Sequence, residues 1–151
     1  MEVAFYKSPI GILKIFSTDY ALKKIELVNA RNDFECSAFN YEVIEQLEAY
    51  FEGRLFRFNI PVEFDKATDF QKKVYDALMS VRYGQTKSYK ELAQMIDNPN
   101  ACRAVGSALA KNPIPIIVPC HRIVNSNGKI GEFALGTDAK KYLLDFEKAH
   151  K

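Results

Sequence analysis

The fold of this chain is constrained most strongly by the stretch Pro113-Ile114-Pro115-Ile116-Ile117-Val118, which runs directly into Pro119-Cys120-His121-Arg122. The apolar part is too short to span a membrane and too rich in proline for the interior of a helix. We expect an extended segment that threads through a packed core, with its end held by Pro119. Such a segment would hold the following Cys-His pair rigidly.

A thiol next to an imidazole at the end of a rigid segment is well placed for nucleophilic attack. The thiolate is the reactive form of cysteine, and a neighbouring base or positive field makes it available near neutral pH. The alternative is a buried structural cysteine beside a surface histidine, because unreactive buried cysteines are common. The Cys120–His121 pair alone does not decide between these interpretations, so the rest of the chain must.

Composition indicates a folded protein and excludes several classes. The chain has 151 residues, of which 48% are hydrophobic, enough to build the core of one ordinary domain or two small ones. No apolar run approaches the roughly 18 residues of a membrane span, and the first residues do not resemble a secretory signal. We therefore expect a cytoplasmic protein without membrane contact.

The cysteines and histidines favour free thiols over a disulfide or zinc framework. Three widely spaced cysteines, Cys36, Cys102 and Cys120, suit a reducing compartment. Only His121 and His150 could add imidazole ligands, and no Cys-x-x-Cys pair occurs. We expect no metal site.

The net charge of +2 conceals an asymmetry between the two halves. Residues 1–67 carry 8 Lys and Arg against 11 Asp and Glu, whereas residues 68–151 carry 13 against 8. A polyanion would therefore dock on the C-terminal half. This excess is too small to establish nucleic-acid binding by itself.

The first 67 residues are expected to form a small α/β domain. Three β-rich runs, at 3–6, 12–16 and 22–28, are separated by short turns and predict an antiparallel sheet. A helix is predicted over 40–52, where Tyr41, Ile44, Leu47, Tyr50 and Phe51 recur at helical spacing, and Gly53 is its expected end.

Residues 68–151 are expected to form a mostly helical domain. Thr68 and Gln71 have the spacing of a capping box, and the helix that follows would bury Phe70, Val74, Leu78 and Met79. Two short helices follow, at 88–96 and 101–110, and the break between them predicts a helix-turn-helix whose second helix could enter a DNA groove. An ordinary helical hairpin is the alternative. The small residues of the second helix favour DNA, since they allow a duplex to approach closely.

With both motifs in view, the chain resembles the methylated-DNA–protein-cysteine methyltransferases, also called O6-alkylguanine-DNA alkyltransferases. The match runs almost continuously from Phe70 to Glu147. It is carried by Gly84-Gln85-Thr86-Lys87-Ser88-Tyr89, Arg103-Ala104-Val105-Gly106, Asn112-Pro113 and Pro119-Cys120-His121-Arg122-Ile123-Val124, and it closes with Lys140 through Leu144. Residues 1–67 match weakly. The resemblance implies an RNase H-like N-terminal domain (1–67) that supports a winged-helix-like domain (68–151), which binds DNA and accepts the alkyl group.

The resemblance also implies a role for each of five residues. Cys120 would accept the alkyl group in an SN2 step that leaves a stable thioether, so each chain acts once. His121 would remove the thiol proton through a water, and Glu147 would orient His121. Asn112 would hold the active-site turn, and Tyr89 would give a proton to the departing guanine.

On the DNA side, the resemblance implies a monomer that binds double-stranded DNA containing O6-alkylguanine through the minor groove. Arg103 would fill the space left by the flipped base, and Ala104, Ser88 and Tyr89 would also contact DNA. The carbonyls of Cys120 and Ile123 would accept from the guanine amine. No cofactor takes part.

The chain departs from the family in the substrate loop, which reads Gly131-Glu132-Phe133-Ala134-Leu135-Gly136 where the usual pattern is Gly-x-Tyr-Ser/Ala-Gly-Gly. Phe133 would still form a wall of the pocket, although it lacks the hydroxyl of the family's tyrosine. The backbone N–H of Ala134 would still reach the guanine oxygen. Leu135 stands where the family has glycine, and we expect it to narrow the pocket against bulky alkyl groups.

Two other functions compete with this interpretation. A non-catalytic helix-turn-helix protein or regulator could recognise alkylated DNA without chemistry, but related proteins of that kind lack the cysteine found here at Cys120. A Cys-His hydrolase would need an oxyanion site, and the sequence carries no signature of one.

Overall fold

The computed structural model describes residues 1–30 and 37–151, so Cys36 lies outside the described residues. The chain divides into two compact units, Met1–Asp65 and Lys66–Lys151. No helix within the described ranges is long and apolar enough to cross a membrane. The roles expected of the two parts, support and alkyl acceptance, stay predictions.

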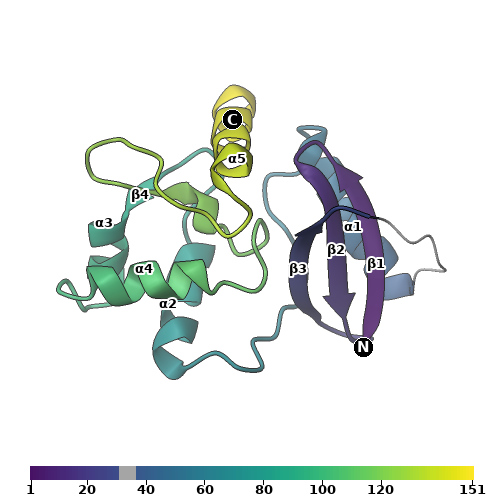
Figure 1. The fold of residues 1–151 in the computed structure, drawn as a ribbon, viewed down its shortest axis with the longest axis horizontal. Helices are drawn as coiled ribbons and strands as arrows, with labels where there is room; N and C mark the ends of the chain where they lie inside the picture. Colours follow the sequence, from purple (N-terminus) through teal and green to yellow (C-terminus); the bar gives the residue numbers. More distant parts are fainter. Residues whose placement is uncertain (31–36) are drawn as a thin grey trace. The chain divides into compact units, whose positions relative to one another are not determined.

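The first unit is a three-stranded antiparallel sheet with one helix against it (Figure 1). Strands β1 (Glu2–Ser8), β2 (Gly11–Ser17) and β3 (Leu22–Val28) are adjacent in chain order. Because side chains alternate between the faces of a strand, Leu13, Ile15 and Ile25 share the buried face. This is the antiparallel arrangement predicted from the sequence.

Helix α1 (Ala38–Phe51) supplies the other half of that core. Ser37 caps it by accepting a hydrogen bond from the backbone N–H of Asn40, and Val43, Leu47, Tyr50 and Phe51 are buried. Tyr41 lies in the predicted helix, but it is 60% exposed and does not contribute to the core. Asn40 takes the buried position instead, where its Oδ1 accepts a 2.6 Å hydrogen bond from the Ser17 hydroxyl.

Four helices dominate the second unit: α2 (Asp69–Met79), α3 (Tyr89–Met95), α4 (Cys102–Ala110) and α5 (Thr137–His150). The capping box predicted at Thr68 and Gln71 is present at the start of α2, and a second one begins α3. The buried residues of α2 are Val74, Tyr75 and Leu78. Met79, the last residue of α2, is 47% exposed, which corrects its predicted burial.

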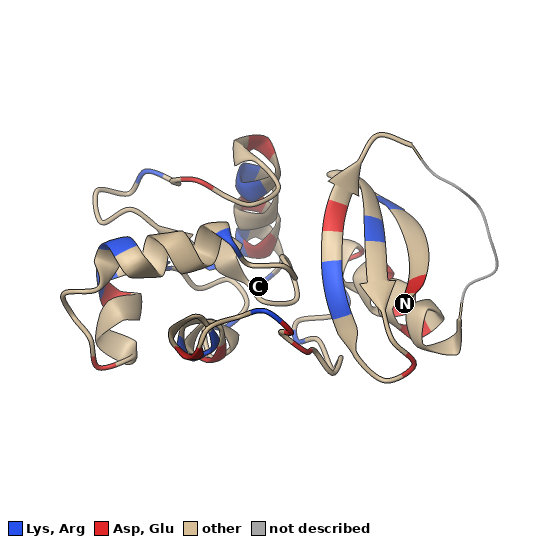
Figure 2. Ribbon diagram, turned by 60° about the horizontal axis from the view of Figure 1, so that its bottom comes forward, with Lys and Arg blue, Asp and Glu red and all other residues tan. Residues whose placement is uncertain are grey.

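Helices α3 and α4 are joined by a tight turn in which Asp97 has a positive φ of 58°. Val105, Ala108 and Leu109 bury one side of α4, and the hydroxyl of Tyr75 on α2 donates a 2.8 Å hydrogen bond to the carbonyl of Ala108. The opposite side of α4 therefore stays open to solvent. Figure 2 shows basic residues at both ends of α4 and uncharged residues along its middle.

A short parallel pairing joins the helix pair to the cysteine segment. Strand β4 (Lys87–Ser88) pairs with β5 (Ile123–Val124), and β5 directly follows the 3-10 turn η1 (Cys120–Arg122). Because Ser88 also caps α3, this pairing brings the first residue of α3, Tyr89, close to the cysteine segment.

The proline-spaced run is buried as expected, but it is not extended. The backbone N–H of Val118 donates to the carbonyl of Ile114 at 3.0 Å, which closes a tight turn. Ile116 lies inside this turn with φ of 76°. A β-branched residue in this region is strained by about 1–3 kcal/mol, so surrounding contacts must hold the turn in place.

Thr68→Ala should lower the free energy of unfolding by about 1 kcal/mol, because the first turn of α2 loses the side-chain partner of its Gln71 N–H. Thr68→Ser keeps the oxygen and is the matched control. Urea unfolding of the three proteins measures the difference. Equal loss in the two variants would show that the capping hydrogen bond does not stabilise this helix.

Candidate active site

Cys120 lies at the start of η1 with only 4% of its surface exposed. Burial raises the pKa of its thiol to about 11, although the Asn112 side chain and the backbone of Ala134 act in the opposite direction. The thiol is therefore protonated at neutral pH in the resting protein. Any reaction through sulfur needs a base that removes this proton.

Asn112 ties the strained turn to the cysteine. Its Nδ2 donates to the Val118 carbonyl at 2.9 Å and to Cys120 Sγ at 3.2 Å. Its Oδ1 accepts from the backbone N–H of Ile114 at 3.0 Å. These three hydrogen bonds span both ends of the turn around Ile116, which accounts for a conformation that the run would not adopt alone.

A buried carboxylate pairs with both residues that follow the cysteine. Glu147 Oε2 lies 2.8 Å from His121 Nε2 and accepts a 2.9 Å hydrogen bond from Arg122 Nη2, while Oε1 accepts from Arg122 Nε at 2.9 Å. The backbone N–H of Gly84 adds a fourth contact at 3.2 Å. Burial alone would raise the pKa of Glu147, but its bonds to His121 and Arg122 outweigh burial and lower it.

The hydrogen bond to Glu147 also decides which nitrogen of His121 is basic. Burial lowers the pKa of His121, so its ring is neutral at pH 7. Because the Glu147 carboxylate can only accept, Nε2 carries the hydrogen and Nδ1 keeps its lone pair. Nδ1 is buried and has no hydrogen-bond partner in the described part of the chain. His121 thus presents an unused base.

Lys140 on α5 is completely buried. Its Nζ donates to the carbonyl of Ile123 at 2.5 Å and to the carbonyl of Glu132 at 3.0 Å. Burial lowers its pKa to about 8, and the nearby Cys120 acts in the opposite direction. Lys140 therefore ties the residue after η1 to the substrate loop and adds a cation near the thiol.

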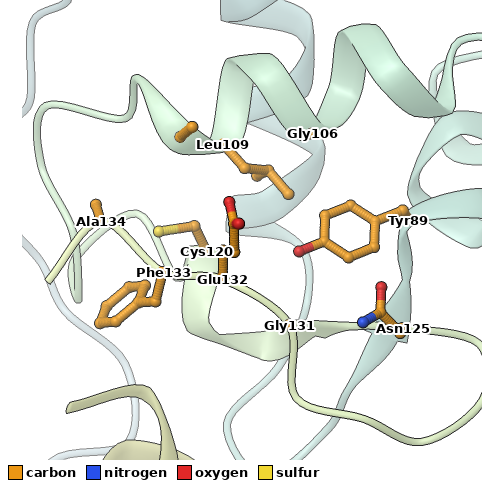
Figure 3. Close-up of a pocket in the computed structure, with 10 residues that line it drawn as sticks. Tyr89, Gly106, Leu109, Cys120, Asn125, Gly131, Glu132, Phe133 and Ala134 are labelled. Atoms are coloured by element: carbon orange, nitrogen blue, oxygen red, sulfur yellow. The ribbon is translucent and has the colours of Figure 1, made fainter. Parts of the chain in front are cut away.

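These elements surround a pocket of about 580 Å³, within the usual size of small-molecule sites (Figure 3). Its lining comes from α3, α4, η1 and the loop that precedes α5, and consists of Tyr89, Gly106, Leu109, Ala110, Cys120, Asn125, Gly131, Glu132, Phe133 and Ala134. Burial raises the pKa of Tyr89, so its hydroxyl keeps its proton at neutral pH. Among residues 1–30 and 37–151, no three His, Cys, Asp or Glu side chains are grouped so that they could hold a metal ion.

Known proteins match both units. Two family models fit the chain: 6-O-methylguanine DNA methyltransferase, ribonuclease-like domain, over residues 1–64, and 6-O-methylguanine DNA methyltransferase, DNA binding domain, over residues 69–149. A methylated-DNA–protein-cysteine methyltransferase of Methanosarcina acetivorans is 40% identical over 97% of this chain and 98% of its own length. The chain belongs to the O6-methylguanine-DNA methyltransferase family.

Two further relatives support membership of this family. A methylated-DNA–protein-cysteine methyltransferase of Mycolicibacterium paratuberculosis is 38% identical over 99% of this chain and 94% of its own length. A crystal structure of Mycobacterium tuberculosis OGT in complex with DNA has a TM-score of 0.90 at 36% identity and covers 99% of this chain and 94% of that chain. The matches confirm the predicted family and fold class, a ribonuclease-like α/β domain followed by a helical DNA-binding domain.

The site residues expected of an O6-methylguanine-DNA methyltransferase fall into three groups. Four line the pocket: Cys120, Tyr89, Phe133 and Ala134. Three lie in the buried hydrogen-bond network: Asn112, His121 and Glu147. The remaining residues lie elsewhere: Arg103 and Ala104 are exposed on α4, Ser88 caps α3, Ile123 is buried, and Leu135 is half-buried and outside the pocket lining.

Sequence reasoning assigned no role to four contributors. Arg122 was quoted only as part of a motif, yet it is the second cation on Glu147. Lys140 and Glu132 were likewise quoted only within motifs, because their importance depends on contacts across the fold. Gly131 could have been found from the substrate-loop pattern: its φ is 73°, and a Cβ there would lie 3.0 Å from the Tyr89 hydroxyl.

Glu147→Gln should lower the free energy of unfolding at pH 7 by about 3–5 kcal/mol, because it leaves Arg122 buried without its countercharge. Asp145→Asn removes an exposed pair with Lys141 on the same helix and should cost no more than about 0.5 kcal/mol. Urea unfolding measures both. If Glu147→Gln loses no more free energy of unfolding than the control, this carboxylate does not stabilise the buried network.

The stability of Glu147→Gln and that of the unsubstituted protein should depend differently on pH in acid. Since the folded-state pKa of Glu147 is lowered, its contribution is complete above the ordinary glutamate value of about 4.3 and is lost as the pH falls toward the folded-state pKa. The free energy of unfolding, measured from pH 6 to pH 3, should therefore decline less steeply for Glu147→Gln than for the unsubstituted protein. Parallel declines would mean that Glu147 does not carry the acid sensitivity.

Proposed function

We propose that this chain repairs O6-alkylguanine in double-stranded DNA by moving the alkyl group onto its own Cys120, once per molecule. The class of activity follows from the family: the chain is a methylated-DNA–protein-cysteine methyltransferase, a DNA repair protein that binds DNA. The observation that carries the assignment to Cys120 is its thiol in the pocket lining, beside a buried histidine whose Nδ1 is unused.

The transfer is a substitution at the alkyl carbon. The Cys120 sulfur forms the new S–C bond as the C–O6 bond of the guanine breaks, and the guanine leaves with that electron pair. With a thiol pKa of about 11, the proton must be removed as the reaction proceeds. His121 Nδ1 takes it through a water, and Glu147 stabilises the imidazolium that results. The product is a thioether, which no residue of the site can cleave.

Tyr89 is the proposed proton donor to the departing guanine. Its hydroxyl lies in the pocket lining and remains protonated at neutral pH, because burial raises its pKa. A guanine anion is a poor leaving group, and a proton supplied as the C–O6 bond breaks lowers that barrier.

The proposed contacts with DNA are made by helix α4. An alkyl group on guanine lies inside the duplex, so the base must rotate out to reach the pocket. Arg103 and Ala104 are exposed on α4, and Gly106, Leu109 and Ala110 of the same helix line the pocket. We propose that α4 enters the minor groove with Arg103 in the gap left by the base. We propose that the protein acts as a monomer, since every proposed catalytic and DNA-contacting role is filled within residues 66–151, and that it acts in the cytoplasm.

Cys120→Ser should abolish methyl transfer from a duplex containing O6-methylguanine while leaving DNA affinity nearly unchanged, since a hydroxyl is a far weaker nucleophile in the same space. Cys102→Ser is the matched control and should react like the unsubstituted protein, with one methyl group per chain by intact mass. Sustained turnover with excess substrate would refute the single-use mechanism. Tight binding without any transfer by the unsubstituted protein would instead indicate a regulator.

Arg103→Ala should slow repair of duplex DNA about tenfold or more, while reaction with free O6-methylguanine changes less than about twofold. Extruding a paired base costs a few kcal/mol, and Arg103 would offset part of it by filling the gap. Lys111→Ala, at the other end of α4, controls for the loss of one positive charge. If Arg103→Ala and Lys111→Ala slow duplex repair equally, Arg103 acts only through its charge.

A further inference from the structure

One face of the three-stranded sheet in the first unit carries aromatic and basic side chains. Helix α1 contacts the other face, through Tyr6 and Ser17, which point to the same side of the sheet as Leu13 and Ile15 (Figure 1). The side chains between these positions point away from α1, because side chains alternate along a strand. On that opposite face the strand register places two rows of three side chains next to each other: Phe5, Lys14 and Glu26, and Val3, Phe16 and Lys24.

The lysines of this face lie over its aromatic rings. Lys14 Nζ is 5.0 Å from the centroid of the Phe16 ring and 5.8 Å from that of Phe5. Lys24 Nζ is 5.8 Å from the Phe16 ring. An ammonium at this distance is attracted by the negative face of a ring. Both rings are half-buried, so each is fixed in the sheet while part of its surface remains open to solvent. These four residues make up an aromatic–lysine face.

The charge of this face is opposite to that of residues 1–67 as a whole, which carry 8 Lys and Arg against 11 Asp and Glu. Within strands β1, β2 and β3, Lys7 points to the same side as Lys14 and Lys24, and the only acidic residue there is Glu26. Glu26 is paired with Lys24 at 2.7 Å. Figure 2 shows basic residues on each of the three strands. The excess of lysine is therefore local to this side of the sheet.

A ligand that matches the face must combine flat rings with negative charge. Single-stranded nucleic acid does so, because every base has a face that can stack on an aromatic side chain and every phosphate can pair with a lysine. Duplex DNA keeps its bases inside the helix, where their faces are covered. An acidic peptide would pair with the lysines but would leave the rings without a stacking partner.

We propose that the aromatic–lysine face binds single-stranded DNA, with one base on Phe5 and the next on Phe16. On binding, each base takes the surface of a ring, and the ammonium groups of Lys14 and Lys24 move from the rings to the neighbouring phosphates. All of these residues belong to the first unit, so the inference does not depend on transfer to Cys120. It gives the first unit a role beyond support of the fold.

The test measures how a fluorescently labelled strand of eight thymidines binds to the full chain, by anisotropy, while an unlabelled, undamaged duplex saturates the second unit. The strand should still bind, and an abasic strand of the same length should bind at least about fivefold more weakly, because it cannot stack. Phe16→Leu should weaken thymidine binding by about fivefold or more. Lys14→Gln should lower the slope of log affinity against log salt by about 0.7, the value for one phosphate contact on a single strand.

Two variants of the first unit are controls. Tyr41→Leu removes an exposed aromatic ring on α1, and Arg57→Ala removes an exposed cation. Each should change the affinity for the thymidine strand less than about twofold. Phe16→Leu and Lys14→Gln should keep the duplex affinity of the unsubstituted protein, which also shows that they are folded.

Three binding results would overturn the proposal: no binding of the strand, its displacement by the duplex, or equal binding of the thymidine and abasic strands. Photo-crosslinking locates the site without any substitution. A strand that contains 5-iodouracil should crosslink to peptides that contain Phe5 or Phe16 when the duplex is present. Crosslinks confined to residues 66–151 would contradict the proposal even if Phe16→Leu failed to fold.

Discussion

The active site depends on one buried carboxylate. Glu147 binds His121 and Arg122 through both of its oxygens and accepts a further hydrogen bond from the backbone of Gly84, so two separate segments of the second unit meet α5 at this residue. Two buried nitrogen-bearing side chains next to Cys120 would be costly without this partner. With it, the imidazole is held in one tautomer and the residue before it is held in η1. The carboxylate is thus a structural anchor, and in the proposed mechanism it also leaves His121 Nδ1 available as a base.

Helix α5, which carries Glu147, also positions residues on the other side of the pocket. Lys140 and Glu147 are seven positions apart on α5, which is two helical turns, and both are buried with Leu143. Lys140 binds the carbonyls of Ile123 and Glu132, while Glu147 binds the side chains that follow the cysteine. One helix face therefore positions both the segment that carries Cys120 and the loop that contains Glu132. Because Cys120 is buried in this arrangement, its thiol stays protonated until a base removes the proton.

Local features of this fold could be predicted from the sequence, and long-range ones could not. The capping box at Thr68 and the antiparallel strands depend on spacing within a few residues, and the structure has both. The run around Ile116 was expected to be extended because its prolines and branched residues favour that state, but side-chain hydrogen bonds from Asn112 impose a turn. The sequence assigned no role to Lys140 or Glu132, since a buried lysine and a pocket carboxylate look like surface charges until the fold brings them to the site. The expected effect of Leu135 depends on the direction of one side chain, which spacing does not reveal; Leu135 is outside the pocket lining.

The proposed mechanism requires that Cys120, and no other group, receives the alkyl group. The most direct measurement mixes the unsubstituted protein with a duplex whose O6-methylguanine carries an isotopically labelled methyl group, digests the product and locates the label by peptide mass spectrometry. We expect the label on the peptide that contains Cys120, at one methyl group per chain, and none on the peptides that contain Cys36 or Cys102. Label on either of those peptides, or loss of the methyl group from the DNA with no label on the protein, would contradict it.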